Sequence, residues 1–115
     1  MTAHVLGMRH EVTLETYNGA LLASGVLLRL SAHVCWSCLV VVSPDHRGHG
    51  LARDLDRAKV RLAVRLGYRV MLCTVRDDNA RQRRAMGKAS PGWARIGPVS
   101  EGISMYMRFL SKVPT

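Results

Sequence analysis

The feature that most constrains the fold is a change of hydrophobic periodicity around a short glycine-containing loop. Before the loop, the residues from Val34 to Ser43 form a nearly continuous apolar run that ends at Pro44, which predicts a central strand covered on both faces. Beyond Gly48, apolar residues recur every three or four positions, at Leu51, Leu55, Ala58, Leu62 and Leu66. This spacing traces one face of a helix that ends near Gly67.

A second apolar run, from Arg69 to Val75, follows the helix. A strand, a helix and a strand in direct succession predict a parallel pair joined by a right-handed crossover. Nearer the N-terminus, Asn18-Gly19 predicts a hairpin with a type I′ turn, which needs positive φ at both central positions. The other predicted elements are strands at 10–17, 20–30, 93–97 and 104–110 and a helix from Asp77 or Asp78 to about Lys88.

These elements together predict an α/β (α+β) fold. Its sheet is expected to be mixed, twisted and largely antiparallel, with a central β-α-β unit and two main helices. With 115 residues, the chain is long enough for one hydrophobic core and too short for two. Residues 1–115 are therefore expected to form a single domain.

The composition indicates a cytoplasmic protein with anionic partners. Lys and Arg number 17 against 8 Asp and Glu, a formal charge of +9, which favours a phosphorylated cofactor, an acidic protein or a nucleic acid without choosing among them. The first residues lack a basic segment followed by an apolar one, and no apolar run approaches the roughly 20 residues of a membrane helix. We therefore expect neither a signal peptide nor a membrane partner.

The cysteines and histidines do not predict a metal site. Cys35 and Cys38 form a CxxC, but neither a second CxxC nor a paired histidine cluster completes zinc coordination. In a strand, residues three apart point to opposite faces. An odd count of three cysteines is typical of a reducing compartment. Buried thiols are the favoured interpretation, and His46 and His49 are interpreted as loop residues.

Residues 42–52 are the segment that carries chemistry. They read Val42-Ser-Pro-Asp-His-Arg-Gly-His-Gly-Leu-Ala52 and join a strand end to a helix start. Such a junction directs unpaired backbone N–H groups and the positive end of a helix dipole toward one point. Gly48 and Gly50 leave the backbone open to a ligand, and Arg47 adds a cation. The segment therefore predicts a pyrophosphate cradle, with a plain turn before a helix as the alternative.

The same residues resemble the acyl-CoA signature of the GNAT acyltransferase superfamily, Arg/Gln-x-x-Gly-x-Gly/Ala, here Arg47 to Ala52. The Val-x-Pro before the signature and several later residues extend the resemblance over about Val34 to Gly97. The resemblance implies that the core strands separate near the loop, and that the pantetheine arm of acetyl-CoA pairs with the free backbone there. The implied acetyl-CoA-binding residues are Val40, Val41, Val42, Arg47, Gly48, His49, Gly50, Leu51, Ala52, Arg53 and Asn79.

The resemblance further implies an N-acetyltransferase that moves an acetyl group from acetyl-CoA to a primary amine by direct attack in a ternary complex. A backbone N–H at Val42 would polarise the thioester carbonyl. Many members have a tyrosine general acid where this chain has Met86, and a glutamate base near Thr74 is absent. Asn79 is equally well explained as a helix cap. The candidates for proton transfer are Tyr106, which we favour, and His33, Cys73 and Asp77.

The resemblance leaves the acceptor and the partners open. Family members usually carry two helices between their first two strands, and only about nine residues precede the first predicted strand here. The acceptor side is therefore open, or completed by another subunit such as the second copy of a homodimer, and the amine can belong to a protein or a small molecule. The alternative function is a GNAT-fold basic module that binds, modifies or inhibits an acidic protein or a nucleic acid with little catalysis. Its surface would be the helix face formed by Arg53, Arg57, Arg61 and Arg65.

Overall fold

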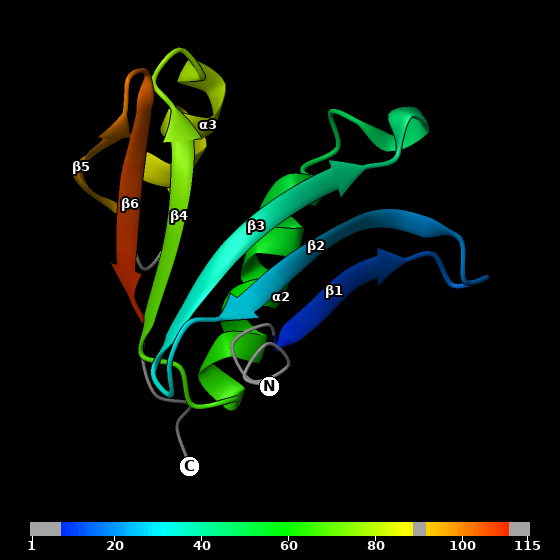
Figure 1. Ribbon diagram of the computed structural model, residues 1–115. Helices are drawn as coiled ribbons and strands as arrows, with labels where there is room; N and C mark the ends of the chain where they lie inside the picture. Colours follow the sequence, from blue (N-terminus) through cyan, green and yellow to red (C-terminus); the bar gives the residue numbers. More distant parts are fainter. Residues whose placement is uncertain (1–7, 89–91, 111–115) are drawn as a thin grey trace.

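The computed structural model describes residues 8–88 and 92–110, which form a six-stranded mixed sheet with two α-helices on one face (Figure 1). In chain order the elements are β1 (Arg9–Glu15), β2 (Leu21–Arg29), β3 (Val34–Val42), the 3-10 helix η1 (Pro44–His46), α2 (Leu51–Arg65), β4 (Val70–Arg76), α3 (Ala80–Gly87), β5 (Ala94–Ser100) and β6 (Ile103–Phe109). The strand order is β1-β2-β3-β4-β6-β5, and every neighbouring pair except β3 and β4 is antiparallel. The predicted fold class is confirmed.

The hairpin of β1 and β2 is confirmed, but its turn is not the predicted type I′. Of Asn18 and Gly19, only Gly19 has a positive φ, at 85°. Gly19 N donates to Thr16 O at 2.9 Å, and Thr16 N donates to Ala20 O at 2.8 Å. The hairpin therefore has a loop longer than two residues, in which a type I turn is followed by one glycine in the left-handed conformation.

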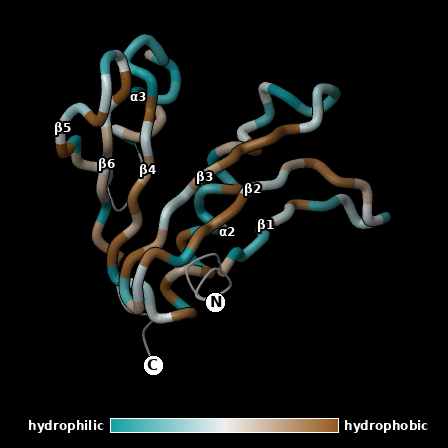
Figure 2. The backbone as a smooth tube through the Cα atoms, in the orientation of Figure 1, coloured by the Kyte–Doolittle hydropathy of each residue, from teal (hydrophilic) through white to brown (hydrophobic). Residues whose placement is uncertain are grey.

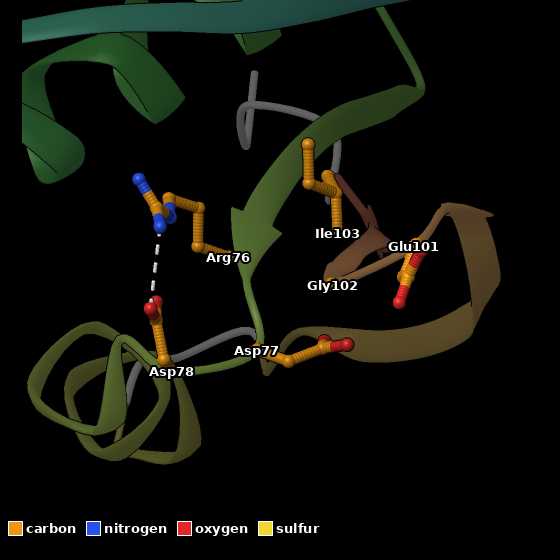
Figure 3. A pocket seen from close by; sticks show the side chains of 6 residues that line it. All are labelled: Arg76, Asp77, Asp78, Glu101, Gly102 and Ile103. Carbon is orange, nitrogen blue, oxygen red and sulfur yellow. Dashed lines mark hydrogen bonds and ion pairs between the residues drawn. The ribbon is translucent and has the colours of Figure 1, made fainter.

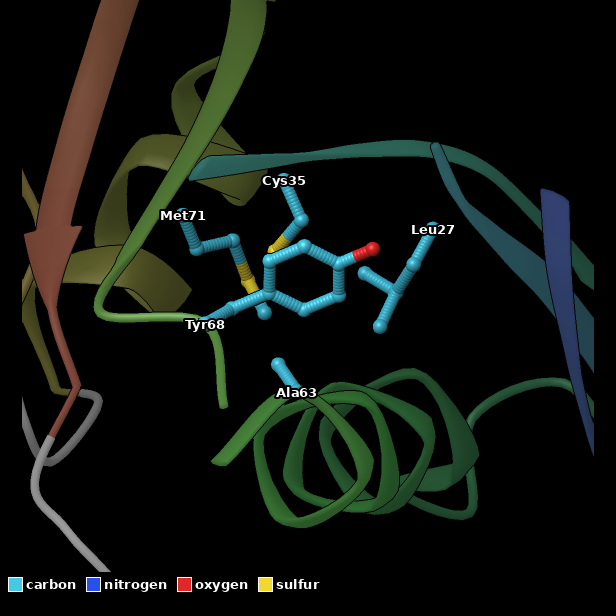
Figure 4. Close-up of a cluster of buried hydrophobic side chains, with 5 residues drawn as sticks. All are labelled: Leu27, Cys35, Ala63, Tyr68 and Met71. Atoms are coloured by element: carbon cyan, nitrogen blue, oxygen red, sulfur yellow. The ribbon is translucent and has the colours of Figure 1, made fainter. Parts of the chain in front are cut away.

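Helix α2 lies along one face of β1, β2 and β3 and closes the main core. Five residues from β2, β3, β4, α2 and the segment between α2 and β4 form its centre, with the ring of Tyr68 among them (Figure 4): Leu27, Cys35, Ala63, Tyr68 and Met71. A second cluster of Val12, Ala23 and Leu55 extends this core toward the hairpin. The hydropathy of the chain follows the same division, with hydrophobic residues along β2 and β3 and hydrophilic ones in the loop after β3 (Figure 2).

The buried face of α2 differs in part from the predicted one. The buried residues are Leu55, Lys59 and Ala63, four positions apart. Leu66 is 45 % exposed, because it follows the last turn of the helix. Gly67 comes next with a φ of 91°, as predicted for a C-terminal glycine. The helix therefore places a lysine, instead of an apolar residue, in the middle of its buried stripe.

Helix α3 packs on the other arm of the sheet, against β4 and β6. Met86 is buried with Cys73 and Val75, and Trp93 and Tyr106 pack around this cluster. Trp93 also borders the main core under α2. Both arms therefore share one continuous layer of side chains on the helix-bearing face.

The helix cap that the sequence offers at Asn79 is confirmed, and the cap predicted at Asp77 or Asp78 is wrong. Asn79, and not Asp77 or Asp78, is the N-cap, and its Oδ1 accepts a hydrogen bond from Gln82 N at 3.1 Å. The two aspartates have other partners. Ser104 Oγ donates to Asp77 Oδ1 at 2.6 Å, and Asp78 pairs with Arg76 at 3.3 Å.

Strand β3 is not covered on both faces, so this prediction is wrong. Cys35 is buried under α2, but Leu39, Val40 and Val41 are 58 %, 53 % and 56 % exposed. Strand β3 pairs with β4 no further than Trp36. Its C-terminal half therefore has a strand neighbour only on the β2 side within the described residues.

The buried thiol of Cys73 gives the fold a pH dependence that can be measured. Burial raises the pKa of Cys73 from 9.0 to about 12. The pKa of Cys73 is higher in the folded state than in the unfolded state. The contribution of the protonated thiol to the free energy of unfolding is therefore fully present below about pH 9 and is lost as the pH rises toward about 12. Above about pH 9, we expect wild-type protein to lose about 1.4 kcal/mol of unfolding free energy per pH unit relative to Cys73→Ala.

Urea titrations of both proteins at about pH 8 and about pH 10.5 test this expectation. Below about pH 9 the difference between the two free energies should be constant, because the thiol is protonated in both the folded and unfolded states. A difference that stays constant up to the higher pH would show that the thiol does not titrate as proposed.

Candidate functional site

The parallel strands β3 and β4 pair over three residues and then diverge (Figure 1). The last pair is Trp36 with Leu72, and no later residue of β3 has a partner on β4 in the part of the chain that the structure describes. The edge of β3 that faces β4, from Ser37 to Val42, therefore has no strand beside it.

The backbone of Val42 points toward this unpaired edge. Ser43 N donates to Leu22 O at 2.8 Å, which makes Val42 and Ala23 a non-hydrogen-bonded antiparallel pair. In such a pair, the N–H and C=O groups point away from the partner strand. Val40, two residues earlier and paired with Gly25, has the same orientation. Both residues therefore present a donor and an acceptor to the side of β4.

A β-bulge interrupts β3 immediately before Val40. Leu39 has no partner on β2, because Gly25 pairs with Val40 and Val26 pairs with Cys38. Its φ of 57° lies in the left-handed region, which is uncommon for a residue other than glycine. The bulge therefore holds the strand in a conformation that needs support from its surroundings.

Lys59 of α2 supplies such support. Its side chain is buried, and Nζ donates to Cys38 O at 3.2 Å and to Leu39 O at 3.1 Å. The sequence analysis does not single out this lysine. The signal for it is its position four residues after Leu55, which places it on the buried face of the helix.

The loop between β3 and α2 exposes backbone donors at the start of the helix. Gly48 and Gly50 have φ of 85° and 76°, conformations that favour glycine. Gly50 is the N-cap of α2, and no side chain caps the helix. The first helical hydrogen bond runs from Asp54 N to Gly50 O at 3.1 Å, so the N–H groups of the preceding turn have no intrahelical acceptor. This arrangement suits an anion.

The formal charges of the loop and the first turn of α2 cancel, so the backbone donors make the region suitable for an anion. Arg47, His49 and Arg53 are exposed, and Arg47 Nε donates to Val42 O at 3.5 Å. Asp45 in η1 and Asp54 in the first turn of α2 offset the charges of Arg47 and Arg53. A Cβ added at Gly48 would meet no atom within 4 Å, so the loop backbone is accessible from that side. The residues from Val40 to Arg53 thus form one contiguous region at the end of β3.

Two of the predicted site residues lie on the other arm, across from the loop (Figure 1). Asn79 caps α3 directly after β4. Tyr106 lies on β6 opposite Cys73 and packs against the cluster that contains Met86. The resemblance places a tyrosine general acid at the position that Met86 occupies in this chain. The phenol of Tyr106 therefore lies in the cluster of side chains around that position.

A separate shallow pocket of about 340 Å³ lies at the tips of β4 and of the β5–β6 hairpin (Figure 3). It is lined by Arg76, Asp77, Asp78, Glu101, Gly102 and Ile103. Two of its three carboxylates are already engaged, one with Ser104 and one with Arg76. We therefore do not include this pocket in the candidate site.

Other kinds of site find little support in residues 8–88 and 92–110. No group of three His, Cys, Asp or Glu side chains is arranged to hold a metal ion in these two segments. Cys35 is buried and Cys38 half-buried, and both are free thiols. Neither of the described helices is long and apolar enough to cross a membrane.

The family comparison assigns this fold to the acetyltransferase class. The sequence model of the acetyltransferase (GNAT) family matches residues 8–89. The chain therefore belongs to this family, as its resemblance implies. No curated protein matches the sequence.

Solved structures of N-acetyltransferases share the fold. The ribosomal-protein-S18-alanine N-acetyltransferase from Escherichia coli is 19 % identical, with a TM-score of 0.68 over 86 % of this chain and 68 % of that one. Mutant forms of the spermidine/spermine N-acetyltransferase from Vibrio cholerae are 14 % identical, with a TM-score of 0.79 over 94 % and 69 %. The GNAT domain of the S. lividans protein PAT is 18 % identical, with a TM-score of 0.74 over 89 % and 61 %.

Proposed function

We propose that this protein transfers an acetyl group from acetyl-CoA to a primary amine by direct attack in a ternary complex. The family itself carries the general part of the proposal, acyl transfer from an acyl-CoA to an amine. The observation that supports it most in this chain is the divergence of β3 from β4 beside the uncapped start of α2. Acetyl-CoA would supply an activated acyl group as its thioester.

The residues between Val40 and Arg53 fit the two polar parts of this donor. The outward-pointing C=O groups of Val40 and Val42 would accept hydrogen bonds from the amides of the pantetheine arm, much as those of another strand would. The N–H groups at the start of α2, with Gly48 and Gly50 beside them, would bind the pyrophosphate. Arg47 and Arg53 would add charge, and Asn79 would approach from the opposite arm.

The chain offers one donor to the carbonyl and one to the leaving group. The N–H of Val42 on the open edge of β3 would donate to the thioester oxygen, where negative charge develops. The hydroxyl of Tyr106, which packs against the cluster that contains Met86, would donate a proton to the departing sulfur, and the proton lost by the attacking nitrogen would pass through water to restore the phenol. The attacking amine must be neutral, so the rate should rise with pH as the amine loses its proton.

The test is a screen of amines with wild-type protein and acetyl-CoA. Free thiol should appear together with an acetylated amine identified by its mass, and both should depend on the protein. The panel should include a peptide with a free N-terminus, a lysine peptide and a polyamine. Protein that binds acetyl-CoA but acetylates no amine would favour the alternative, a GNAT-fold binding module.

One observation favours a macromolecular partner in addition to the acceptor. Arg53, Arg57, Arg61 and Arg65 are all exposed along α2, and none of them forms a salt bridge within the described residues. Like charges four positions apart repel each other. We propose that this stripe binds an acidic protein or a nucleic acid.

Reversing two charges of the stripe tests this partner surface. We expect Arg57→Glu with Arg61→Glu to weaken binding to duplex DNA or polyglutamate by at least about tenfold at low salt. The affinity for acetyl-CoA should not change. The matched control, Arg81→Glu with Arg84→Glu on exposed positions of α3, makes the same charge change elsewhere. Equal losses for both double variants would indicate only nonspecific attraction to the net charge.

A further inference from the structure

Lys59 is buried in a place built to hold its ammonium group. The residue is 1 % exposed. Nζ lies 3.1 Å from Ser37 Oγ, 3.2 Å from Cys38 O and 3.1 Å from Leu39 O. An ammonium group has three donors and no acceptor. The three oxygens therefore match its hydrogen-bonding capacity.

Strand β2 leaves the space for this group. A Cβ added to Gly25 would lie 2.5 Å from Lys59 Cε, 2.8 Å from Nζ and 2.7 Å from Leu39 O. These distances are too short for a side chain, so only glycine fits there. The lysine, the bulge at Leu39 and the glycine thus form one unit from three elements.

Stability alone does not explain a charge in this position. Burial lowers the pKa of Lys59, since desolvation disfavours the charged form, although Cys38 and Asp56 partly oppose this effect. Replacing a buried ionic group together with its polar partners by apolar groups is often neutral or stabilising, so a buried charge is weak evidence for a purely stabilising role. The lysine is therefore better explained by what it does to the atoms that it contacts.

Lys59 acts on two peptide groups of the bulge. In a trans peptide, the N–H points opposite to the C=O of the preceding residue. Because Nζ binds the carbonyls of Cys38 and Leu39, the N–H groups of Leu39 and Val40 point away from the ammonium. Val40 N–H is also the one that the pairing with Gly25 directs to the open edge of β3. A cation on the carbonyl side of a peptide makes its N–H a stronger donor.

Building on the proposed function, we infer that Lys59 is a positioning residue for acyl transfer. It fixes the bulge in β3 and polarises the peptide between Leu39 and Val40, so that Val40 N–H, in place of Val42 N–H, is the donor to the thioester carbonyl. The positive charge behind this peptide also stabilises negative charge on the carbonyl oxygen.

The test uses a stable analogue of acetyl-CoA in which a methylene replaces the thioester sulfur and the carbonyl carbon is ¹³C. Its carbonyl resonance should move downfield on binding to wild-type protein, because hydrogen bonding polarises the bond. In Lys59→Met, which keeps the length of the side chain, that displacement should fall by at least about half. The dissociation constant should change less than about threefold, because the pyrophosphate cradle is intact.

Four further measurements separate positioning from a structural role. Lys59→Gln keeps a donor without the charge, and it should also lose the downfield displacement. Lys88→Met removes an exposed lysine from the end of α3, and it should behave as wild type. Lys59→Met should remain folded but unfold at a lower temperature than wild type, because the carbonyl groups of Cys38 and Leu39 lose this donor. In an assay with an amine that wild-type protein acetylates, the kcat of Lys59→Met should fall about tenfold, while its KM for acetyl-CoA stays unchanged.

The outcomes distinguish this inference from the proposed function. If wild-type protein does not bind the analogue, the proposed function fails and the role of Lys59 fails with it. If wild type binds and both Lys59 variants give the wild-type resonance, only the role of Lys59 is overturned. If both Lys59 variants fail to fold and to bind the analogue, neither shows a changed resonance in a folded protein. That result would assign Lys59 to stability and would also overturn the inference.

Discussion

Gly50→Glu should lose at least about 100-fold of the affinity for acetyl-CoA. Gly50 is the N-cap of α2 with a φ of 76°, and a side chain there would stand at the mouth of the helix where the phosphates are proposed to bind. Its carboxylate would also offset the partial positive charge at the start of the helix, which otherwise attracts the pyrophosphate. Isothermal titration of acetyl-CoA into both proteins measures the change.

Gly67→Glu is the matched control. Gly67 has a φ of 91° and lies at the other end of the same helix. The substitution therefore introduces the same side chain and a similar backbone strain. We expect it to lower stability modestly and to leave the affinity for acetyl-CoA within about twofold of wild type. A similar loss of affinity in both variants would mean that strain in α2, and not the anion site, controls binding.

The second large effect should come from Asp56, which pairs with a buried arginine. Arg108 Nη1 lies 2.9 Å from Asp56 Oδ2, with the Arg108 side chain 1 % and the Asp56 side chain 32 % exposed. The guanidinium also lies 4.7 Å from the centre of the Trp93 ring. Asp56→Ala should destabilise the fold by about 2–3 kcal/mol, because it leaves the buried cation without this carboxylate while the solvent reaches only part of the pair.

Thermal and urea unfolding measure this loss, which corresponds to a fall in Tm of about 10 °C or more for a domain of this size. Asp78→Ala is the control, because the ion pair of Asp78 with Arg76 is about three-quarters exposed on both sides. Exposed pairs of this kind contribute less than about 1 kcal/mol. Equal effects of the two substitutions would show that the pair with Arg108 does not anchor α2 to β6.

The sequence is sufficient to predict the element order, because each signal is local and strong. Leucines at helical spacing follow directly after a glycine loop, and a hairpin turn is marked by Asn18-Gly19. The parallel pair around α2 then follows from the right-handed crossover rule. The turn type and the cap of α3 are less predictable. They depend on which neighbouring group competes for each donor, as Ser104 does for Asp77.

The support beneath β3 could not be predicted, because it depends on contacts among three elements. A bulge needs an extra residue relative to β2, and only the register of Gly25, Val26 and Cys38 reveals it. A lysine on an apolar helix face normally suggests a residue that reaches solvent. Here Gly25 gives the ammonium an internal site, so Lys59 stays buried.

The same reasoning explains why a candidate cofactor loop is easier to propose from the sequence than the catalytic groups. The loop is contiguous in sequence, from Arg47 to Arg53, and its two glycines adopt positive φ angles that favour glycine. Proton transfer depends on side chains from different strands and helices. Tyr106 therefore stays a prediction, supported by its packing against the cluster that contains Met86.

The central claim is that acetyl-CoA binds along the open edge of β3 and at the start of α2. The most direct test is a titration of ¹⁵N-labelled protein with acetyl-CoA, following each backbone amide by NMR. The account predicts saturable shifts that are largest from Val40 to Val42 and from Arg47 to Arg53, with little change near Gly67. An absence of saturable shifts, or shifts confined to the arginine stripe of α2, would contradict it.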